Sequence, residues 1–190
     1  MKKNLYNAQL FEKIDYSSTK IADTEFDSCT FKNCNFSNSD LSGIDFIDCI
    51  FDTCNLSMAK TNNTAIRNGT FVNCKVVGVD FGRCIEFLFS VSFKSCTLDY
   101  SSFFKRKLKK ISFDECVIRD VNFSEADLSG ADFNECDLSN SVFNRTNLSG
   151  ADFRSAINYS INPELNNVKK AKFSLSGIRG LLDCWDITVE

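Results

Sequence analysis

Bulky apolar residues recur at every fifth position along most of this chain. The series runs from Tyr16 to Phe81, then resumes after a two-residue slip at Leu88 and runs to Phe153, with Thr61 as its one polar member. We call each of these positions a centre. A period of five matches neither an α-helix, with about 3.6 residues per turn, nor a flat strand, with about two. The pattern predicts a solenoid of short repeated units, which acts through its surface rather than through a catalytic pocket.

The residue two positions before each centre is usually small. The stretch from Ala126 to Ser155 shows the unit most clearly and reads ADLSG ADFNE CDLSN SVFNR TNLSG ADFRS. Gly43, Gly130 and Gly150 each follow a centre by two positions, where a corner needs permissive backbone. We therefore expect two inward-facing side chains per unit, the centre and the small residue, and three side chains that face water.

This unit resembles the A(D/N)Lxx consensus of the pentapeptide-repeat family over about residues 14–156. The resemblance implies an all-β fold, a right-handed quadrilateral (four-sided) parallel β-helix solenoid with four units in each turn. Residues one turn apart would then stack in adjacent coils. Because phenylalanine recurs every ten residues from Phe93 to Phe153, it would form stacks on two opposite faces. We expect Phe113, Phe133 and Phe153 to lie directly above one another.

Cysteine is abundant, but its positions argue against disulfide or metal chemistry. Nine of the ten cysteines occupy the small inward position, and only Cys184 does not. Cysteine behaves there as a small hydrophobic residue. The CxxxxC spacing at Cys29 and Cys34 is the repeat period rather than a ligand spacing, and histidine is absent. With no nucleophile–base pair and no phosphate loop either, we expect no catalytic residues, no metal and no cofactor, and hence no enzyme.

Charge is unevenly distributed, although the net charge is only −3. Residues 21–56 carry seven acids and one base, residues 60–110 carry ten bases and three acids, and residues 114–152 carry nine acids and two bases. Pairing between coils, as in the series Asp40, Lys60 and Asp80, explains part of this pattern. The last block has too few bases to be neutralised locally. The candidate acidic surface consists of Asp114, Glu115, Asp127, Asp132, Glu135, Asp137 and Asp152.

Two features interrupt the repeat. Residues 82–87, GRCIEF, place Glu86 where a centre is due, which predicts a bulge, a short loop or a bend. In the basic run 105–110, Arg106 occupies a small inward position, where an unpaired guanidinium cannot be buried. We expect the coil to open there, as a solvated corner or as a contact for phosphate or an acidic patch. The exposed set would be Lys105, Arg106, Lys107, Lys109 and Lys110.

The repeat ends after Ala156, which divides the chain into a repeat region, 1–156, and a C-terminal segment, 157–190. Apolar residues in this segment are spaced first as on one face of a short α-helix and then as in a strand. We expect a helix–strand cap on the open coil. Its apolar content exceeds what one end of a narrow rod needs, which predicts a homodimer. The interface would consist of Ile178, Leu181, Leu182, Trp185, Ile187 and Val189.

The tail, AKFSLSGIRGLLDCWDITVE, also resembles the ends of the Qnr-like and MfpA-like quinolone-resistance members of the family. This resemblance implies a head-to-head dimer that mimics DNA, binds DNA gyrase or topoisomerase IV, and protects these enzymes from quinolone drugs. The charge is consistent with mimicry. Residues 114–152 make about two coils, or roughly 10 Å of rod. Their net charge of −7 is comparable with the roughly six charges of B-DNA over that length.

An interaction scaffold or self-protection factor with a different partner is the alternative, because a fold does not fix a function. The basic middle segment interrupts any continuous acidic track, and the chain lacks the long inserted loops of larger Qnr proteins. Ice binding is excluded by threonines that keep no common position in the repeat. No apolar run is long enough to span a membrane, and the start lacks a signal-peptide core. We therefore expect a cytoplasmic protein that binds neither membrane nor nucleic acid directly.

Overall fold

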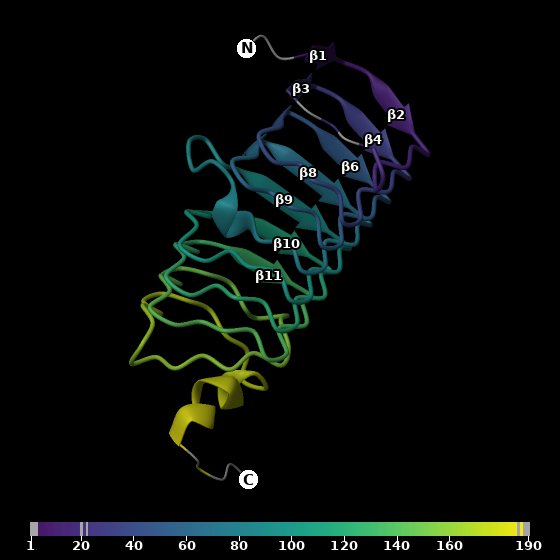
Figure 1. Cartoon of the computed structure of the whole chain (residues 1–190). Coiled ribbons are helices and arrows are strands. Elements are labelled where there is room, and N and C mark those ends of the chain that lie inside the picture. The colour runs from purple at the N-terminus through teal and green to yellow at the C-terminus, as the bar shows by residue number, and fades with distance from the viewer. Residues whose placement is uncertain (1–3, 20, 22, 186, 188–190) are drawn as a thin grey trace.

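The protein is an elongated solenoid of short parallel strands (Figure 1). The computed structural model describes residues 4–19, 21, 23–185 and 187. One sheet consists of β1 (Asn4–Asn7), β3 (Thr24–Asp27), β5 (Asp45–Ile47) and β7 (Ala65–Arg67). The other consists of β2 (Leu10–Glu12), β4 (Thr30–Lys32), β6 (Ile50–Asp52), β8 (Gly69–Val72), β9 (Val91–Lys94), β10 (Ser112–Asp114) and β11 (Asp132–Asn134). The prediction of an all-β parallel solenoid is confirmed.

Successive coils stack in a constant register. Phe31 pairs with Phe51 in one part of the seven-stranded sheet and Phe113 pairs with Phe133 in another, an offset of 20 residues in each case. Isolated bridges repeat this offset beyond the strands, as between Asn122 and Val142. Each coil therefore has four walls, and the seven-stranded sheet forms one of them.

The repeat breaks between β8 and β9, where the offset rises to 22 residues because Phe71 pairs with Phe93. The 3₁₀-helix η1 (Phe81–Arg83) precedes a loop that carries the two additional residues and projects from the rod (Figure 1). Of the predicted alternatives, the structure has the short loop. The expectation that Leu88 is a centre is wrong, because Leu88 is 62% exposed and Phe89 is buried in its place. The register resumes at Phe93.

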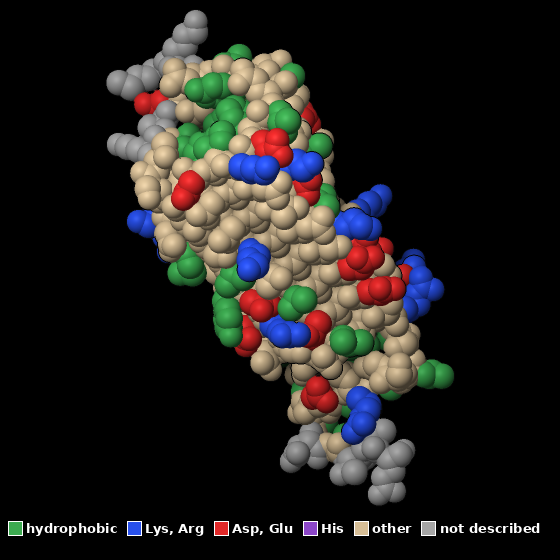
Figure 2. All heavy atoms as spheres, turned by 90° about the vertical axis from the view of Figure 1, so that its right-hand side faces the viewer, with side chains coloured by type: hydrophobic (Ala, Val, Ile, Leu, Met, Phe, Trp, Pro, Cys, Tyr) green, Lys and Arg blue, Asp and Glu red, His purple; other side chains and the backbone are tan. Residues whose placement is uncertain are grey.

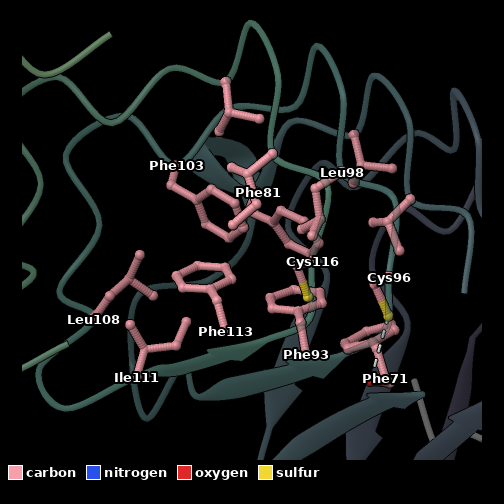
Figure 3. Close-up of a cluster of buried hydrophobic side chains, with 14 of the residues drawn as sticks. Phe71, Phe81, Phe93, Cys96, Leu98, Phe103, Leu108, Ile111, Phe113 and Cys116 are labelled. Carbon is pink, nitrogen blue, oxygen red and sulfur yellow. Dashed lines mark hydrogen bonds between the residues drawn. The ribbon is translucent and has the colours of Figure 1, made fainter. Parts of the chain in front are cut away.

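The core is a set of aromatic ladders. The ring centroids of Phe113 and Phe133 lie 5.2 Å apart, and those of Phe133 and Phe153 lie 4.7 Å apart, with nearly parallel rings in both pairs. A second ladder on the opposite wall includes Phe103 and meets the first edge to face. Figure 3 shows Phe71, Phe93 and Phe113 in one row, facing Phe81 and Phe103. The predicted stacking is confirmed.

The small inward positions also behave as expected. Nine of the ten cysteines are buried free thiols, and Cys184 is exposed. Buried thiols donate to nearby backbone oxygens: Cys96 Sγ donates to the carbonyl oxygen of Phe71 (Figure 3) and to that of Lys94. Burial raises the pKa of the Cys84 thiol to about 12. The nine buried cysteines therefore act as small packing groups of the core.

Candidate interaction surface

Five of the seven predicted acidic residues lie on one wall or its corner. Asp132 in β11 of the seven-stranded sheet and Asp152 form one column through a bridge, whereas Asp114 in β10 is in register with Asn134, in a parallel column of the same wall. Glu115 and Glu135 occupy equivalent corner positions at the end of that wall, both with positive φ. The remaining two, Asp127 and Asp137, lie in columns on the adjoining walls. The wall of the seven-stranded sheet is therefore the principal acidic surface of the C-terminal half.

Bases that lie mostly outside residues 114–152 neutralise part of this block. Asp114 pairs with Lys94 at 2.6 Å, and Asp137 pairs with Arg119 at 2.7 Å. Three further ion pairs involve acids of this block: Lys109 with Asp127 at 3.5 Å, Arg154 with Asp152 at 2.8 Å and Lys172 with Asp152 at 3.2 Å. Most of these bases belong to the coil before or the coil after. The acids are therefore partly compensated along the rod.

Three acids on the principal wall differ from the rest. Within the described part of the chain, the carboxylates of Glu115, Asp132 and Glu135 form no ion pair, although Glu115 accepts a hydrogen bond from the neutral Ser95 Oγ at 2.9 Å. Figure 2, which views the molecule from the right-hand side of Figure 1, shows small groups of acidic and basic side chains close together, separated by areas without charged side chains. The predicted acids of this wall that no ion pair within the described residues neutralises are therefore Glu115, Asp132 and Glu135.

Two paired carboxyls are held in their ionised form. Burial by itself would raise the pKa of Asp137, but hydrogen bonds from Ser139, Asn158 and Arg119 outweigh it and lower the pKa to about 2. Hydrogen bonding from Arg154 is the main cause that lowers the pKa of Asp152 to about 2. Both groups therefore remain negative at any physiological pH.

The basic run 105–110 does not open the coil as expected. Lys105, Lys107, Lys109 and Lys110 are exposed, but Arg106 is only 5% exposed. Lys107 pairs with Glu86 of the projecting loop at 2.6 Å, and Lys105 pairs with Glu125 of the following coil at 3.4 Å. The prediction that Arg106 is exposed is wrong because its guanidinium finds partners inside the tube.

Those partners belong to the projecting loop, residues 82–89, in the preceding coil. Arg106 Nη2 donates to the carbonyl oxygen of Gly82 at 2.7 Å and to that of Cys84. The guanidinium carbon lies 5.0 Å from the centroid of the Phe89 ring, in a cation–π contact. Sequence reasoning correctly excluded an unpaired buried arginine, but it did not connect Arg106 with the break more than 20 residues earlier.

The same loop carries apolar side chains that sequence reasoning did not assign to any surface. Phe87 is 69% exposed, and Ile85 and Leu88 are also exposed. The Arg67 guanidinium lies 5.8 Å from the Phe87 ring centroid. The signal in the sequence was the slip itself, because two residues without a place in the core must lie outside it.

The C-terminal segment caps the tube with 3₁₀-helices. η2 (Ile178–Leu181) and η3 (Asp183–Trp185) replace the predicted α-helix. A β-carbon at Gly180 would collide with the backbone oxygen of Tyr159, and the Gly180 carbonyl accepts a hydrogen bond from Ile161 N–H. The tail thus lies so close to the last coil that a regular α-helix with side chains on every face does not fit.

The tail residues assigned to dimerisation divide into two groups. Leu181 and Leu182 are half-buried, and Leu181 packs against the core. Ile178, Trp185 and Ile187 are exposed. No strand is formed at Ile187, and Val189 lies outside the described residues. The outward apolar surface of the cap therefore rests on Ile178, Trp185 and Ile187.

Comparison with known protein families identifies the repeat. Residues 24–103 and 86–173 match the family described as a pentapeptide repeat region. The chain belongs to the pentapeptide-repeat family. No characterised protein sequence matches this pentapeptide-repeat protein significantly.

Solved structures show the same fold. The protein is similar to trypsin-treated QnrB1, a plasmid-mediated fluoroquinolone resistance protein, with a TM-score of 0.63, 21% identity and 99% of each chain covered. Full-length QnrB1 gives a TM-score of 0.54 with 18% identity, over 97% of this chain and 100% of that one. HetL, a pentapeptide-repeat protein involved in heterocyst differentiation regulation in the cyanobacterium Nostoc, gives a TM-score of 0.60 with 15% identity. The match covers 92% of this chain and 88% of HetL. At these identities the similarity establishes the fold alone.

Neither a metal cluster nor a membrane-spanning helix is present in the described part of this pentapeptide-repeat protein. No group of three or more histidine, cysteine or acidic residues there is placed to hold a metal ion. None of the described helices is long and apolar enough to cross a bilayer. The features that stand out are therefore surfaces: the acidic wall, the projecting loop with the basic run below it, and the apolar cap.

Proposed function

We propose that this protein is a non-enzymatic DNA mimic that binds a type II topoisomerase, either DNA gyrase or topoisomerase IV. Its acidic wall would occupy the basic groove that otherwise holds DNA. The observation that carries the proposal is that Asp114, Asp132 and Asp152 lie in two neighbouring columns of one wall, with Glu115 and Glu135 along its corner. Coils about 4.8 Å apart set acidic side chains at intervals comparable with the phosphates of DNA.

Uncompensated charge decides which acids contribute most. A carboxylate already bound to a lysine or arginine gains less from a basic partner than a free one does, and exposed pairs are worth little in either state. Glu115, Asp132 and Glu135 should therefore contribute most to electrostatic steering towards a basic groove. The paired acids Asp114, Asp137 and Asp152 would exchange one basic partner for another.

A homodimer through the cap completes the proposal. Ile178, Trp185 and Ile187 would pack against their equivalents in a second copy, with Leu181 and Leu182 beneath them. Because the acidic wall lies in the half of the chain nearest this cap, dimerisation would bring two acidic walls towards the middle of a longer rod. A two-fold symmetric enzyme would meet the symmetric middle first. Protection from quinolone drugs would follow from displacement of the DNA that the drugs require.

The four exposed lysines of the run 105–110 fit a secondary contact. They would meet acidic side chains of the enzyme outside its DNA groove, because their charge is opposite to that needed for mimicry. The projecting loop lies next to them through the pair of Lys107 with Glu86.

The alternative is an interaction scaffold with another partner. The pairing of most acids within the rod favours it, since such a surface carries less free charge than the sequence indicates. The similarity of fold extends to HetL, whose described role is in heterocyst differentiation regulation. The two proposals differ in whether a topoisomerase is inhibited at all.

The test is inhibition of gyrase supercoiling and of topoisomerase IV decatenation by micromolar protein. We expect the native protein to inhibit at least one enzyme and the double variant Asp132→Asn/Glu135→Gln to inhibit it about tenfold less. The matched control, Glu12→Gln/Asp52→Asn, removes two acids from the same wall at the far end and should inhibit like the native protein. Absence of inhibition of both enzymes would reject the proposal and leave the scaffold.

A further inference from the structure

Arg106 stands where the repeat has room only for a small side chain. Its column continues through Cys84 in the coil before and Ala126 in the coil after, both buried. An arginine fits there because the preceding coil is two residues longer than its neighbours. The two irregularities, one in the loop and one in the next coil, therefore occupy the same part of the tube.

The loop also leaves two carbonyl groups without the backbone N–H donors that such groups have in regular coils. In regular coils the carbonyl at the small position accepts from the next coil, as Arg106 O accepts from Asp127 N–H at 2.8 Å. At Cys84 the chain turns away into the loop, and the donor to its carbonyl oxygen is the Arg106 side chain. A buried carbonyl without a donor is costly, so this contact stabilises the loop in its observed path.

Gly82 shows the same substitution. Elsewhere the corner N–H donates to a carbonyl oxygen in the following coil, that of the residue directly after the stacked centre. Glu125 N–H, for example, donates to Asn144 O. In the coil above the loop, Asn63 N–H donates instead to Arg83 O, one residue further on. The Gly82 oxygen accepts from Arg106 Nη2 at 2.7 Å. One guanidinium thus serves both carbonyls that the insertion displaces.

We propose that Arg106 is a positioning residue that locks residues 82–89 into a preformed apolar tip. The lock acts at the base of the loop, where Arg106 also stacks on Phe89. Further out, Ile85 N–H donates to Thr64 O at 2.8 Å, and Glu86 pairs with Lys107 at 2.6 Å. Ile85, Phe87 and Leu88 consequently face solvent from a fixed base.

A fixed tip is an advantage in docking because the loop does not have to be ordered when the partner binds. The tip lies beside the lysines to which the proposed function gives a secondary contact, so the role of the lock in binding rests on that function. The lock itself does not depend on any partner. Glu86, a carboxylate within the tip, favours a recess in a protein over a lipid surface as the site that receives it.

Hydrogen exchange on the free protein tests the lock directly. The variant Arg106→Met keeps an apolar side chain in the tube and removes the donors to Gly82 and Cys84. We expect amide exchange in 82–89 to become about tenfold faster or more, with little change in 126–153. Arg119→Met, which removes a surface guanidinium, is the matched control and should leave 82–89 unchanged. Equal exchange of 82–89 in native protein and Arg106→Met would overturn the proposal.

A deletion tests whether Arg106 and the insertion form one unit. Removal of Ile85 and Glu86 restores the five-residue period, with Leu88 as a centre and Cys84 as its small residue. We expect Arg106→Ala to lower the melting temperature of the full-length chain but to raise that of the shortened chain, where no carbonyl awaits the guanidinium. The same sign in both chains would show that Arg106 is unrelated to the loop.

Inhibition assays then connect the lock with binding. Phe87→Ser removes the tip without touching the lock, and it should weaken topoisomerase inhibition by about as much as Arg106→Met does. Full inhibition by Phe87→Ser would contradict the docking role of the tip and leave the lock intact. If the native protein inhibits no topoisomerase, the proposed function fails, and hydrogen exchange alone decides whether Arg106 locks the loop.

Discussion

The corners of this solenoid demand a backbone conformation that few side chains favour. The residue two positions after a centre has a positive φ, and most corners carry no glycine: Glu135 has φ 52° and Arg145 has φ 54°, against 69° for Gly150. The left-handed region costs a residue with a β-carbon about 1–2 kcal/mol. Each such corner therefore stores strain that the packed core overcomes, and glycine relieves it at Gly150.

Arg145→Gly should therefore stabilise the protein by about 1 kcal/mol, because relief of strain exceeds the added entropy of the unfolded chain. Arg145 forms no ion pair within the described residues, so little else is lost. The neighbouring change Asn144→Gly, at a position where φ is not positive, should destabilise instead. Urea unfolding of both variants measures this, and a destabilised Arg145→Gly would contradict the strain argument.

Asp137 makes a second prediction, for acid stability. Its pKa of about 2 lies below the ordinary value near 4, so the folded protein holds this proton less tightly than the unfolded chain does. Its contribution is fully present above about pH 4 and is lost as the pH falls towards 2. Asp137→Asn should cost on the order of 1–2 kcal/mol at pH 7 and much less near pH 2.5. An equal cost at both pH values, measured by urea unfolding, would refute it.

At the scale of elements, the tail differs most from expectation. Its spacing of apolar residues favoured an α-helix, but Gly177 and Gly180 pack against Tyr159, and the chain forms two short 3₁₀-helices there. Tertiary contact overrides local propensity in so short a segment. The result is a cap with half-buried Leu181 below and exposed Ile178 and Trp185 above.

This division guides the test of the dimer. Ile178→Asp/Trp185→Asp places charge on the outer surface without removing a core contact, so we expect a folded monomer with its sheet spectrum intact. Leu175→Asp is the control, since Leu175 is 90% exposed on the same segment. Sedimentation velocity would distinguish these states, and a dimer that survives the double substitution would exclude this interface.

The sequence predicts well those features that the repeat itself determines, and poorly those that depend on an irregularity in another coil. Phe113, Phe133 and Phe153 follow from the period alone, because each slot repeats the one before it. Arg106 does not, because its environment is set by the loop in the preceding coil. Pairs such as Lys94 with Asp114 lie one coil apart and could be read from the offset, whereas the pair of Arg119 with Asp137 depends on side-chain reach between two columns of one wall.

For the whole molecule, these outcomes revise the picture of a uniformly acidic rod. Ion pairs compensate five of the nine acids between residues 114 and 152, and the unpaired acids of the principal wall within the described residues are Glu115, Asp132 and Glu135. The loop and the lysines of 105–110 add a region of opposite character nearer the middle of the rod. A topoisomerase would thus be recognised by a limited acidic area rather than by a continuous imitation of DNA.

Competition with DNA tests this account most directly. A labelled DNA duplex bound to gyrase, or to topoisomerase IV, is titrated with the protein at several salt concentrations. We expect the protein to displace the duplex, with an affinity that falls as salt rises and that Asp132→Asn/Glu135→Gln reduces more than Glu12→Gln/Asp52→Asn does. A complex in which the protein and the duplex are bound together to the same enzyme would contradict mimicry.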